Sequence, residues 1–220
     1  MVEPEDSIEF EERDVLRLER SLLKDNAAEL LRDYIVSGRV GSGAKLVERQ
    51  VSAALGVSRM PIRDAMIKLE QQGLVVSRPS GRFVIAISER EARQLNQVRS
   101  SLEYLAVQLA VDSMAARETA MLELALHKMR KACATRDRVM FVRADLEIHD
   151  AIWQASSNPY LQKTLTTILG PLQVAVSNSA ETFDWAETLT IHEDLVRRIV
   201  ARDRDGAMAA MRTHMESITR

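Results

Sequence analysis

The sequence predicts a mainly α-helical protein in two parts, with three helices and a small β-hairpin followed by a bundle of about six helices. Three observations support this fold class. The chain has 220 residues, enough for two domains of ordinary size. Its apolar residues recur at helical spacing over most of the length, and its β-prone residues gather in one short stretch, residues 74–86.

Composition excludes several classes of protein. The chain is 46% hydrophobic and has no apolar run approaching the roughly 18 residues of a membrane-spanning helix, so we expect no membrane partner. It has no signal-peptide pattern at its start, and Cys133 is its single cysteine, which rules out an intramolecular disulfide framework. We therefore expect a cytoplasmic protein.

The net charge of −2 conceals three regions with different balances. Residues 1–19 have a net charge of −6, and we expect them to be a mobile acidic leader without chemistry. Residues 20–86 have a net charge of +5, which suits a nucleic-acid-binding module. Residues 87–220 have a net charge of −1 and are expected to form the second domain.

The first two helices are predicted from apolar spacing and from glycines that suit left-handed C-terminal caps. The first helix runs from Leu23 to Gly38. The second begins near Val47, after a glycine-rich turn, and ends at Gly56.

A third helix and a hairpin complete the first part. Ser58 is expected to cap the helix through its hydroxyl, with Pro61 in the first turn and Gly73 at the end. Two β-prone runs, Leu74–Ser77 and Arg82–Ala86, then form a hairpin. Three helices and a hairpin, with a tight glycine-containing turn between the second and third helices, describe a winged helix-turn-helix.

Six helices are predicted beyond residue 86. Ser88 and Glu91 form a capping-box pattern at the start of a long helix that reaches about Ala116. Five further helical stretches follow, approximately at residues 118–134, 138–156, 159–180, 184–203 and 206–219.

The segment GSGAKLVERQVSAALGVSRMPIRDAMIKLEQQGLV resembles the DNA-binding signature of GntR-type transcriptional regulators. With its flanks, the resemblance covers most of residues 23–86. It implies that this part binds double-stranded DNA through the second and third helices and the wing. The contacts that the resemblance implies are Arg49, Ser58, Arg59, Met60, Pro61, Arg63 and Gly81.

The residues of the third helix support this interpretation. Arg59 and Arg63 lie four apart and share one face near the helix start, where guanidinium groups can pair with guanine or phosphate in the major groove. An isolated Arg-x3-Arg pattern is more often a solvated helix face, so the surrounding motif decides. Met60 replaces the more usual small hydroxyl residue and offers only contact with a thymine methyl. One helix-turn-helix per chain predicts a homodimer on an inverted repeat.

Three of the four histidines form a pattern with one aspartate in the second part. Asp145 and His149 lie one turn apart on one helix, His192 lies on the next-to-last helix and His214 on the last. The Asp-x3-His pattern alone is weak evidence for a metal site, because a histidine on an amphipathic helix is more often a hydrogen-bonded core or surface residue.

The segments DLEIHDAIWQASSNPYL and IHEDLVRRIVARDRDGAMAAMRTHM resemble the ligand-binding domain of the FCD subgroup of GntR regulators, over roughly residues 90–217. This resemblance implies that Asp145, His149, His192 and His214 bind a divalent metal that also receives a carboxylate of a small organic acid effector. Nitrogen and oxygen ligands without a thiolate suit zinc or nickel first, and also manganese or iron.

Arg99, in the segment RSSLE, matches a position that pairs with the effector carboxylate in this subgroup. The alternative is an ordinary surface arginine on a helix. His127 matches no position of the pattern and is given no role.

The expected function is a sequence-specific DNA-binding regulator, a repressor controlled by the effector, and not an enzyme. One alternative is a regulator with a purely structural metal and no effector. Another is a metal-dependent hydrolase, which would need a general acid or base near the metal. Glu147 points away from Asp145 and His149 on a helix, and a hydrolase does not explain the DNA-binding motif.

Overall fold

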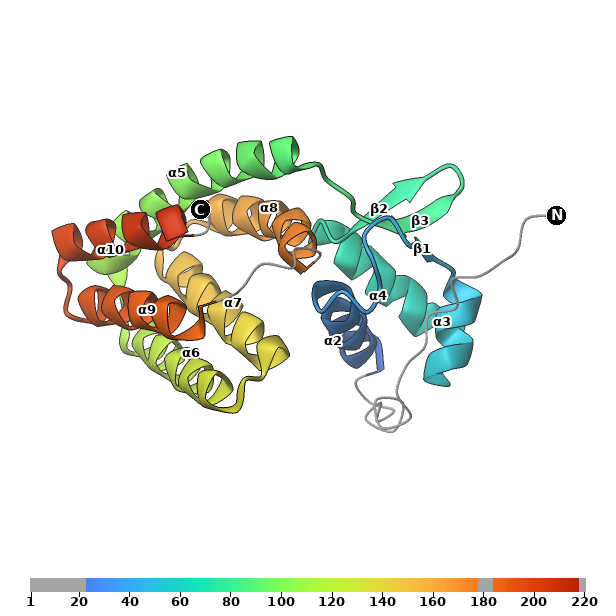
Figure 1. The fold of residues 1–220 in the computed structure, drawn as a ribbon, viewed down its shortest axis with the longest axis horizontal. Helices are drawn as coiled ribbons and strands as arrows, with labels where there is room; N and C mark the ends of the chain where they lie inside the picture. Colours follow the sequence, from blue (N-terminus) through green and yellow to red (C-terminus); the bar gives the residue numbers. More distant parts are fainter. Residues whose placement is uncertain (1–22, 178–183, 218–220) are drawn as a thin grey trace. The chain divides into compact units, whose positions relative to one another are not determined.

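The computed structural model describes residues 23–177 and 184–217, so the expected acidic leader at residues 1–19 lies outside the described residues. Within these ranges the chain has nine helices and one small antiparallel sheet, as the sequence predicts (Figure 1). The chain divides into two compact units. The first holds the described residues up to Ala92 together with the segment that begins at Thr167, and the second holds the rest.

Three helices and three strands make up most of the first unit. They are α2 (Leu23–Val36), α3 (Glu48–Leu55) and α4 (Arg59–Gln71), with β1 (Lys45–Leu46), β2 (Val75–Arg78) and β3 (Gly81–Val84). The strands form an antiparallel sheet in the order β1-β3-β2. Strand β1 was not predicted, because two residues are too short for an alternating pattern to show; they pair with Phe83 and Arg82 of β3.

Buried apolar side chains from all three helices and the hairpin form the core of the first unit. Helix α4 shows how the sequence produces this core, because its buried residues recur every three or four positions and share one face. The largest buried core residues are Leu31, Ile35, Leu55, Ile62, Met66, Leu69 and Leu74.

The ends of these helices follow the predicted caps with one exception. Gly38 and Gly56 adopt left-handed φ angles of 78° and 65°. Ser58 occupies the N-cap of α4, but its hydroxyl makes no capping hydrogen bond, so that prediction was wrong. A capping hydroxyl accepts from the second or third backbone N–H of the helix, and the third residue here is Pro61, which has none.

The six predicted helices beyond residue 86 are all present. They are α5 (Glu89–Ser113), α6 (Ala116–Thr135), α7 (Arg138–Ala155), α8 (Pro159–Ser177), α9 (Trp185–Val200) and α10 (Arg204–Ser217). The predicted capping box begins α5: the Ser88 amide donates to Glu91 Oε2 over 2.7 Å, and the Glu91 amide donates to Ser88 Oγ over 3.3 Å.

Helices α9 and α10 are separated differently from the prediction. The left-handed conformation of Arg202, with φ 56°, follows the end of α9. Asp203 then accepts a hydrogen bond from the Gly206 amide over 3.0 Å, which starts α10 before the predicted residue 206.

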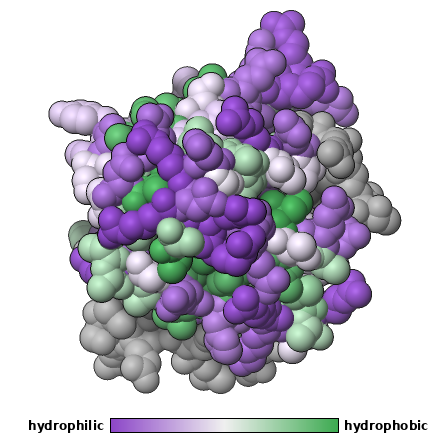
Figure 2. Space-filling model, turned by 90° about the vertical axis from the view of Figure 1, so that its left-hand side faces the viewer, coloured by the Kyte–Doolittle hydropathy of each residue, from purple (hydrophilic) through white to green (hydrophobic). Residues whose placement is uncertain are grey.

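Helices of the described ranges are too short or too polar to cross a membrane. The face drawn in Figure 2 is mostly hydrophilic, with smaller apolar areas between the charged residues.

Replacing Gly56 by alanine should lower the free energy of unfolding by about 1 kcal/mol, because a Cβ disfavours the left-handed conformation that ends α3. Gly41→Ala is the matched control: Gly41 has no positive φ, and a Cβ there meets no atom within 4 Å. Urea denaturation of both variants measures the difference. Equal stability of the two variants would contradict the proposed capping role of Gly56.

Candidate DNA interface and candidate metal centre

The first turn of α4 presents its predicted contact residues to solvent. The side chains of Arg59 and Met60 are exposed, with Met60 72% exposed, and the side chain of Arg63 is 63% exposed. Pro61 between them is half-buried. Ser58 is exposed just before the helix, and Arg49 is exposed on α3. Exposed basic groups at a helix start are suited to contact phosphates and base edges.

Glu48 joins α3, α4 and the hairpin, a role that the sequence analysis missed. Nε and Nη2 of Arg63 lie 3.2 and 3.3 Å from its two carboxylate oxygens, and Nη1 of Arg82 in β3 lies 2.8 Å from Oε1. The hydrogen bond from Arg63 outweighs the opposing effect of burial and, with Arg82, holds the pKa of Glu48 below its ordinary value. The ionised carboxylate therefore fixes the direction in which Arg63 leaves α4.

Gly81 lies at the tip of the hairpin between two basic side chains of the sheet. Its φ of +128° suits only glycine, and a Cβ would lie 3.1 Å from Cε of Lys45. The cationic groups of Lys45 and Arg78 lie 5.8 and 5.2 Å from the ring centroid of Phe83. Lys45 on β1 and Arg78 on β2 thus add positive charge to the sheet, which was not predicted from the sequence.

Helix caps fix the positions of the helices that hold the histidine cluster. The Asp137 carboxylate accepts a hydrogen bond from the Met140 amide at the start of α7. At the start of α9, the Asp184 carboxylate accepts from the amides of Ala186 and Glu187. Each cap satisfies amides that have no partner inside the helix, and so sets the residue at which the helix begins.

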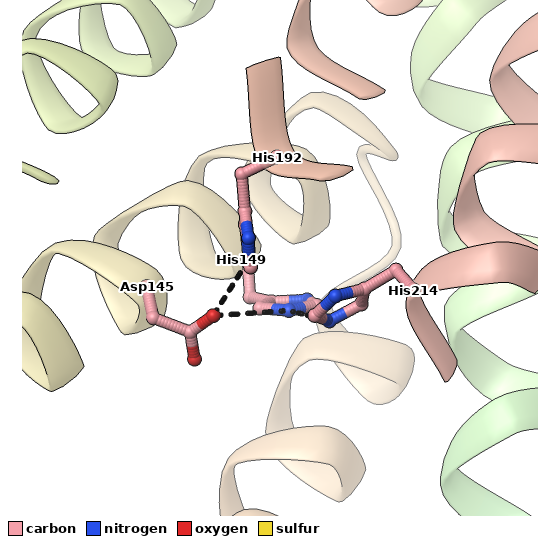
Figure 3. A group of neighbouring side chains, drawn as sticks. All are labelled: Asp145, His149, His192 and His214. Atoms are coloured by element: carbon pink, nitrogen blue, oxygen red, sulfur yellow. Dashed lines mark hydrogen bonds and ion pairs between the residues drawn. The ribbon is translucent and has the colours of Figure 1, made fainter. Parts of the chain in front are cut away.

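The structure brings all four predicted metal ligands together (Figure 3). Asp145 and His149 come from α7, His192 from α9 and His214 from α10. One nitrogen or oxygen atom of each lies within 4.8 Å of the others. The three imidazoles are buried, whereas the Asp145 side chain stays 26% exposed.

The hydrogen bond of His192 determines which of its nitrogens faces the cluster. Nδ1 lies 2.8 Å from the Thr188 carbonyl oxygen, which can only accept, so Nδ1 has the proton. Nε2 lies 2.7 Å from Oδ1 of Asp145 and has no partner with hydrogen-bond geometry among the described residues. At this distance a proton on Nε2 or a cation beside both atoms makes the contact favourable.

His149 has the same orientation. Nη2 of Arg99 lies 3.3 Å from its Nε2, and because a guanidinium only donates, Nε2 is the acceptor. Nε2 also lies 3.0 Å from Nε2 of His214 and 4.0 Å from Oδ1 of Asp145. Nε2 of both His149 and His192 therefore faces the cluster, and that of His149 accepts from Arg99.

The electrostatics of the cluster keep its acid ionised and one imidazole neutral. Burial raises the pKa of Asp145, but the contact with His192 and the nearby His149 and His214 outweigh it and hold the pKa well below its ordinary value. Burial is the first cause that lowers the pKa of His214 well below its ordinary value, and the neighbouring imidazoles of His192 and His149 lower it further. Ionised carboxylate and neutral imidazole are the protonation states that bind metals.

Arg99 is buried beside the cluster rather than exposed on the helix surface. Its Nε lies 3.2 Å from Oε1 of Glu103, a buried carboxylate one turn further along α5. Glu103 also accepts a hydrogen bond from Nε1 of Trp153 over 2.8 Å. The sequence analysis missed Glu103 and Trp153, although the i,i+4 spacing of Arg99 and Glu103 was a visible signal.

The two residues that the sequence analysis left without a role lie outside the cluster. His127 is exposed on α6. Glu147 pairs with Nζ of Lys128, at 2.7 Å, and so does not face the four ligands as a general base would have to.

Comparison with known proteins agrees with this architecture. The model of the gntR family of bacterial regulatory proteins matches residues 23–85, and the FCD domain model matches residues 94–217. The HTH-type transcriptional repressor RspR of Escherichia coli (strain K12) is 28% identical over 192 residues, which cover 86% of this chain and 84% of RspR.

Two solved structures share the fold. E. coli McbR/YncC superposes with a TM-score of 0.72 at 23% identity, over 88% of this chain and 93% of that chain. A GntR regulator from Rhodococcus sp. RHA1 has a TM-score of 0.70 at 22% identity, over 88% of this chain and 94% of that chain. With a gntR-type winged helix-turn-helix before an FCD domain that spans more than half of its length, this chain belongs to the FCD-containing transcriptional regulators of the gntR family.

Proposed function

We propose that this regulator is a repressor that binds an inverted-repeat operator as a homodimer and is released by a small carboxylate bound at a divalent metal in its FCD domain. The name of RspR describes that relative as a transcriptional repressor, which supports repression here. An effector that binds the DNA-free state more tightly than the DNA-bound state shifts the equilibrium toward release.

The observation that carries the metal proposal is that one ligand atom from each of four side chains lies within 4.8 Å of the others, with all three imidazoles buried. Asp145, His149, His192 and His214 would hold the ion, and zinc or nickel fits their nitrogen and oxygen donors best. When bound, the ion supplies a positive centre that attracts an anionic oxygen.

The charges around the site support a carboxylate as the effector. Arg99 is always protonated, and Asp145 and Glu103 are held ionised by their contacts. With neutral imidazoles and a divalent ion, these buried groups would have one net positive charge. A monocarboxylate would neutralise it, and Arg99 beside His149 is placed to donate to such a group.

Arg59→Ala and Arg63→Ala should each weaken specific operator binding by about 1 to 3 kcal/mol, because each removes a base or phosphate contact at the start of α4. Footprinting and binding titrations at physiological salt, with the dimer confirmed by its mass in solution, measure this. Arg117→Ala, an exposed arginine on α6, is the control and should bind as the wild type does. Unchanged affinity of both α4 variants would show that another element reads the operator.

His192→Ala and His214→Ala should each lose the metal, because the remaining three side chains no longer enclose the ion. Elemental analysis should find about one divalent ion per wild-type chain, and chelation should lower the thermal stability of the wild type. His127→Ala is the matched control and should keep the ion. Full metal content in His192→Ala would refute the assigned site.

Arg99→Ala should keep the metal and weaken effector binding about tenfold or more, because a charge-assisted hydrogen bond to the carboxylate is lost. The effector is first found by thermal stabilisation of the metal-loaded protein with a panel of sugar acids, hydroxy acids, dicarboxylates and amino acids. Arg130→Ala is the control, since Arg130 pairs with Glu193 instead. If no carboxylate stabilises the wild type or releases operator DNA, the metal is structural and the sensing proposal is wrong.

A further inference from the structure

Glu103 is a fully buried carboxylate, with 0% of its side chain exposed, in contact with three donor groups. Oε1 lies 3.2 Å from Nε of Arg99 and 3.0 Å from Nδ1 of His149. Oε2 accepts the hydrogen bond from Nε1 of Trp153. A buried carboxylate is costly unless such donors surround it, so this arrangement needs a physical reason beyond filling the core.

His192 and His149 differ in what fixes the nitrogen that faces away from the cluster. For His192, the backbone carbonyl of Thr188 accepts a hydrogen bond from Nδ1. For His149, Glu103 is the acceptor nearest to Nδ1, and it comes from a different helix, α5. Histidines that bind metals generally direct the second nitrogen to a carboxylate or a carbonyl, which fixes the tautomer and the ring orientation.

We propose that Glu103 is a positioning residue with two roles. It keeps the proton of His149 on Nδ1, so that the Nε2 lone pair, which accepts from Arg99 in this structure, is available when a metal takes the place of that donor. It also holds the Arg99 guanidinium near the cluster. This inference rests on the proposed metal site. It assigns to one carboxylate both the orientation of a metal ligand and the place of the effector-binding arginine.

At His149, the charge of Glu103 acts alongside its capacity to accept a hydrogen bond. The 3.0 Å contact is oblique, because Nδ1 has no partner with hydrogen-bond geometry among the described residues. An oblique contact acts through the field of the carboxylate on the ring N–H and on the guanidinium. A neutral amide of the same shape should therefore not replace it.

Glu103→Gln tests the proposal with almost no change in volume. Competition with a chromophoric chelator should show zinc affinity about 10- to 100-fold weaker than in the wild type, the usual effect of losing such a partner. The tautomer of His149 is measured in the metal-free protein by nitrogen-15 NMR of the histidine rings. In the wild type the proton should lie on Nδ1. In the variant the ring should exchange between the tautomer protonated on Nδ1 and the tautomer protonated on Nε2. A purely structural role of Glu103 would change stability without moving this tautomer.

Glu147→Gln is the matched control. It makes the same substitution two residues before His149 on α7, but Glu147 pairs with Lys128. Zinc affinity within about twofold of the wild type is expected, since the pair is exposed and weak.

Trp153→Phe is a second variant, in case Glu103→Gln does not fold. It removes one donor to Glu103 and leaves the carboxylate charged, so zinc affinity should fall by less than in Glu103→Gln, with His149 still protonated on Nδ1. Wild-type zinc affinity and an unchanged tautomer in Glu103→Gln would overturn the inference. If the wild type binds none of zinc, nickel, manganese and iron, the proposed metal site fails, and the tautomer of His149 still decides whether Glu103 positions the ring.

Discussion

The cluster in the FCD domain depends on the 2.7 Å distance between the Asp145 carboxylate and Nε2 of His192. The Thr188 carbonyl accepts from Nδ1 of the ring, so Nε2 is the atom that faces Asp145. Three helices bring this pair together with His149 and His214. A buried contact of this kind needs a proton or a cation between its atoms, and the metal that we propose would interact with all four side chains at once.

Around this point, burial and close polar contacts together decide the protonation of the other groups. Desolvation keeps His214 neutral, whereas Glu103 stays ionised because its contacts with His149, Arg99 and Trp153 outweigh the effect of burial. Hydrogen bonds to an ionised group are worth about 1.5 to 3 kcal/mol, more than those between neutral groups. The site is thus built from charges that partly compensate each other, and the anionic effector that we propose would complete the balance once a divalent ion is bound.

In the first unit, too, a carboxylate holds arginine side chains, but here the pairs are partly exposed to solvent. Glu48 also holds two arginines from other elements, Arg63 and Arg82, but its side chain is 24% exposed. Solvent and salt screen such pairs, so they contribute little to stability and act mainly on the direction of Arg63. DNA phosphates can compete for that arginine, whereas Glu103 has no comparable competitor in its buried position.

The sequence by itself determined the nine helices of the described ranges, the hairpin and the four proposed metal ligands, because periodicity, caps and family motifs are local or fixed in spacing. Strand β1 exists because it pairs with β3, which its two residues alone do not indicate. The Ser58 hydroxyl makes no capping hydrogen bond, because Pro61 has no amide N–H to donate. Only the tertiary structure decided that Arg99 is buried beside His149 and that Glu103 lies between them. Those contacts join α5 to α7 across about fifty residues, and no local pattern records which helix faces pack together.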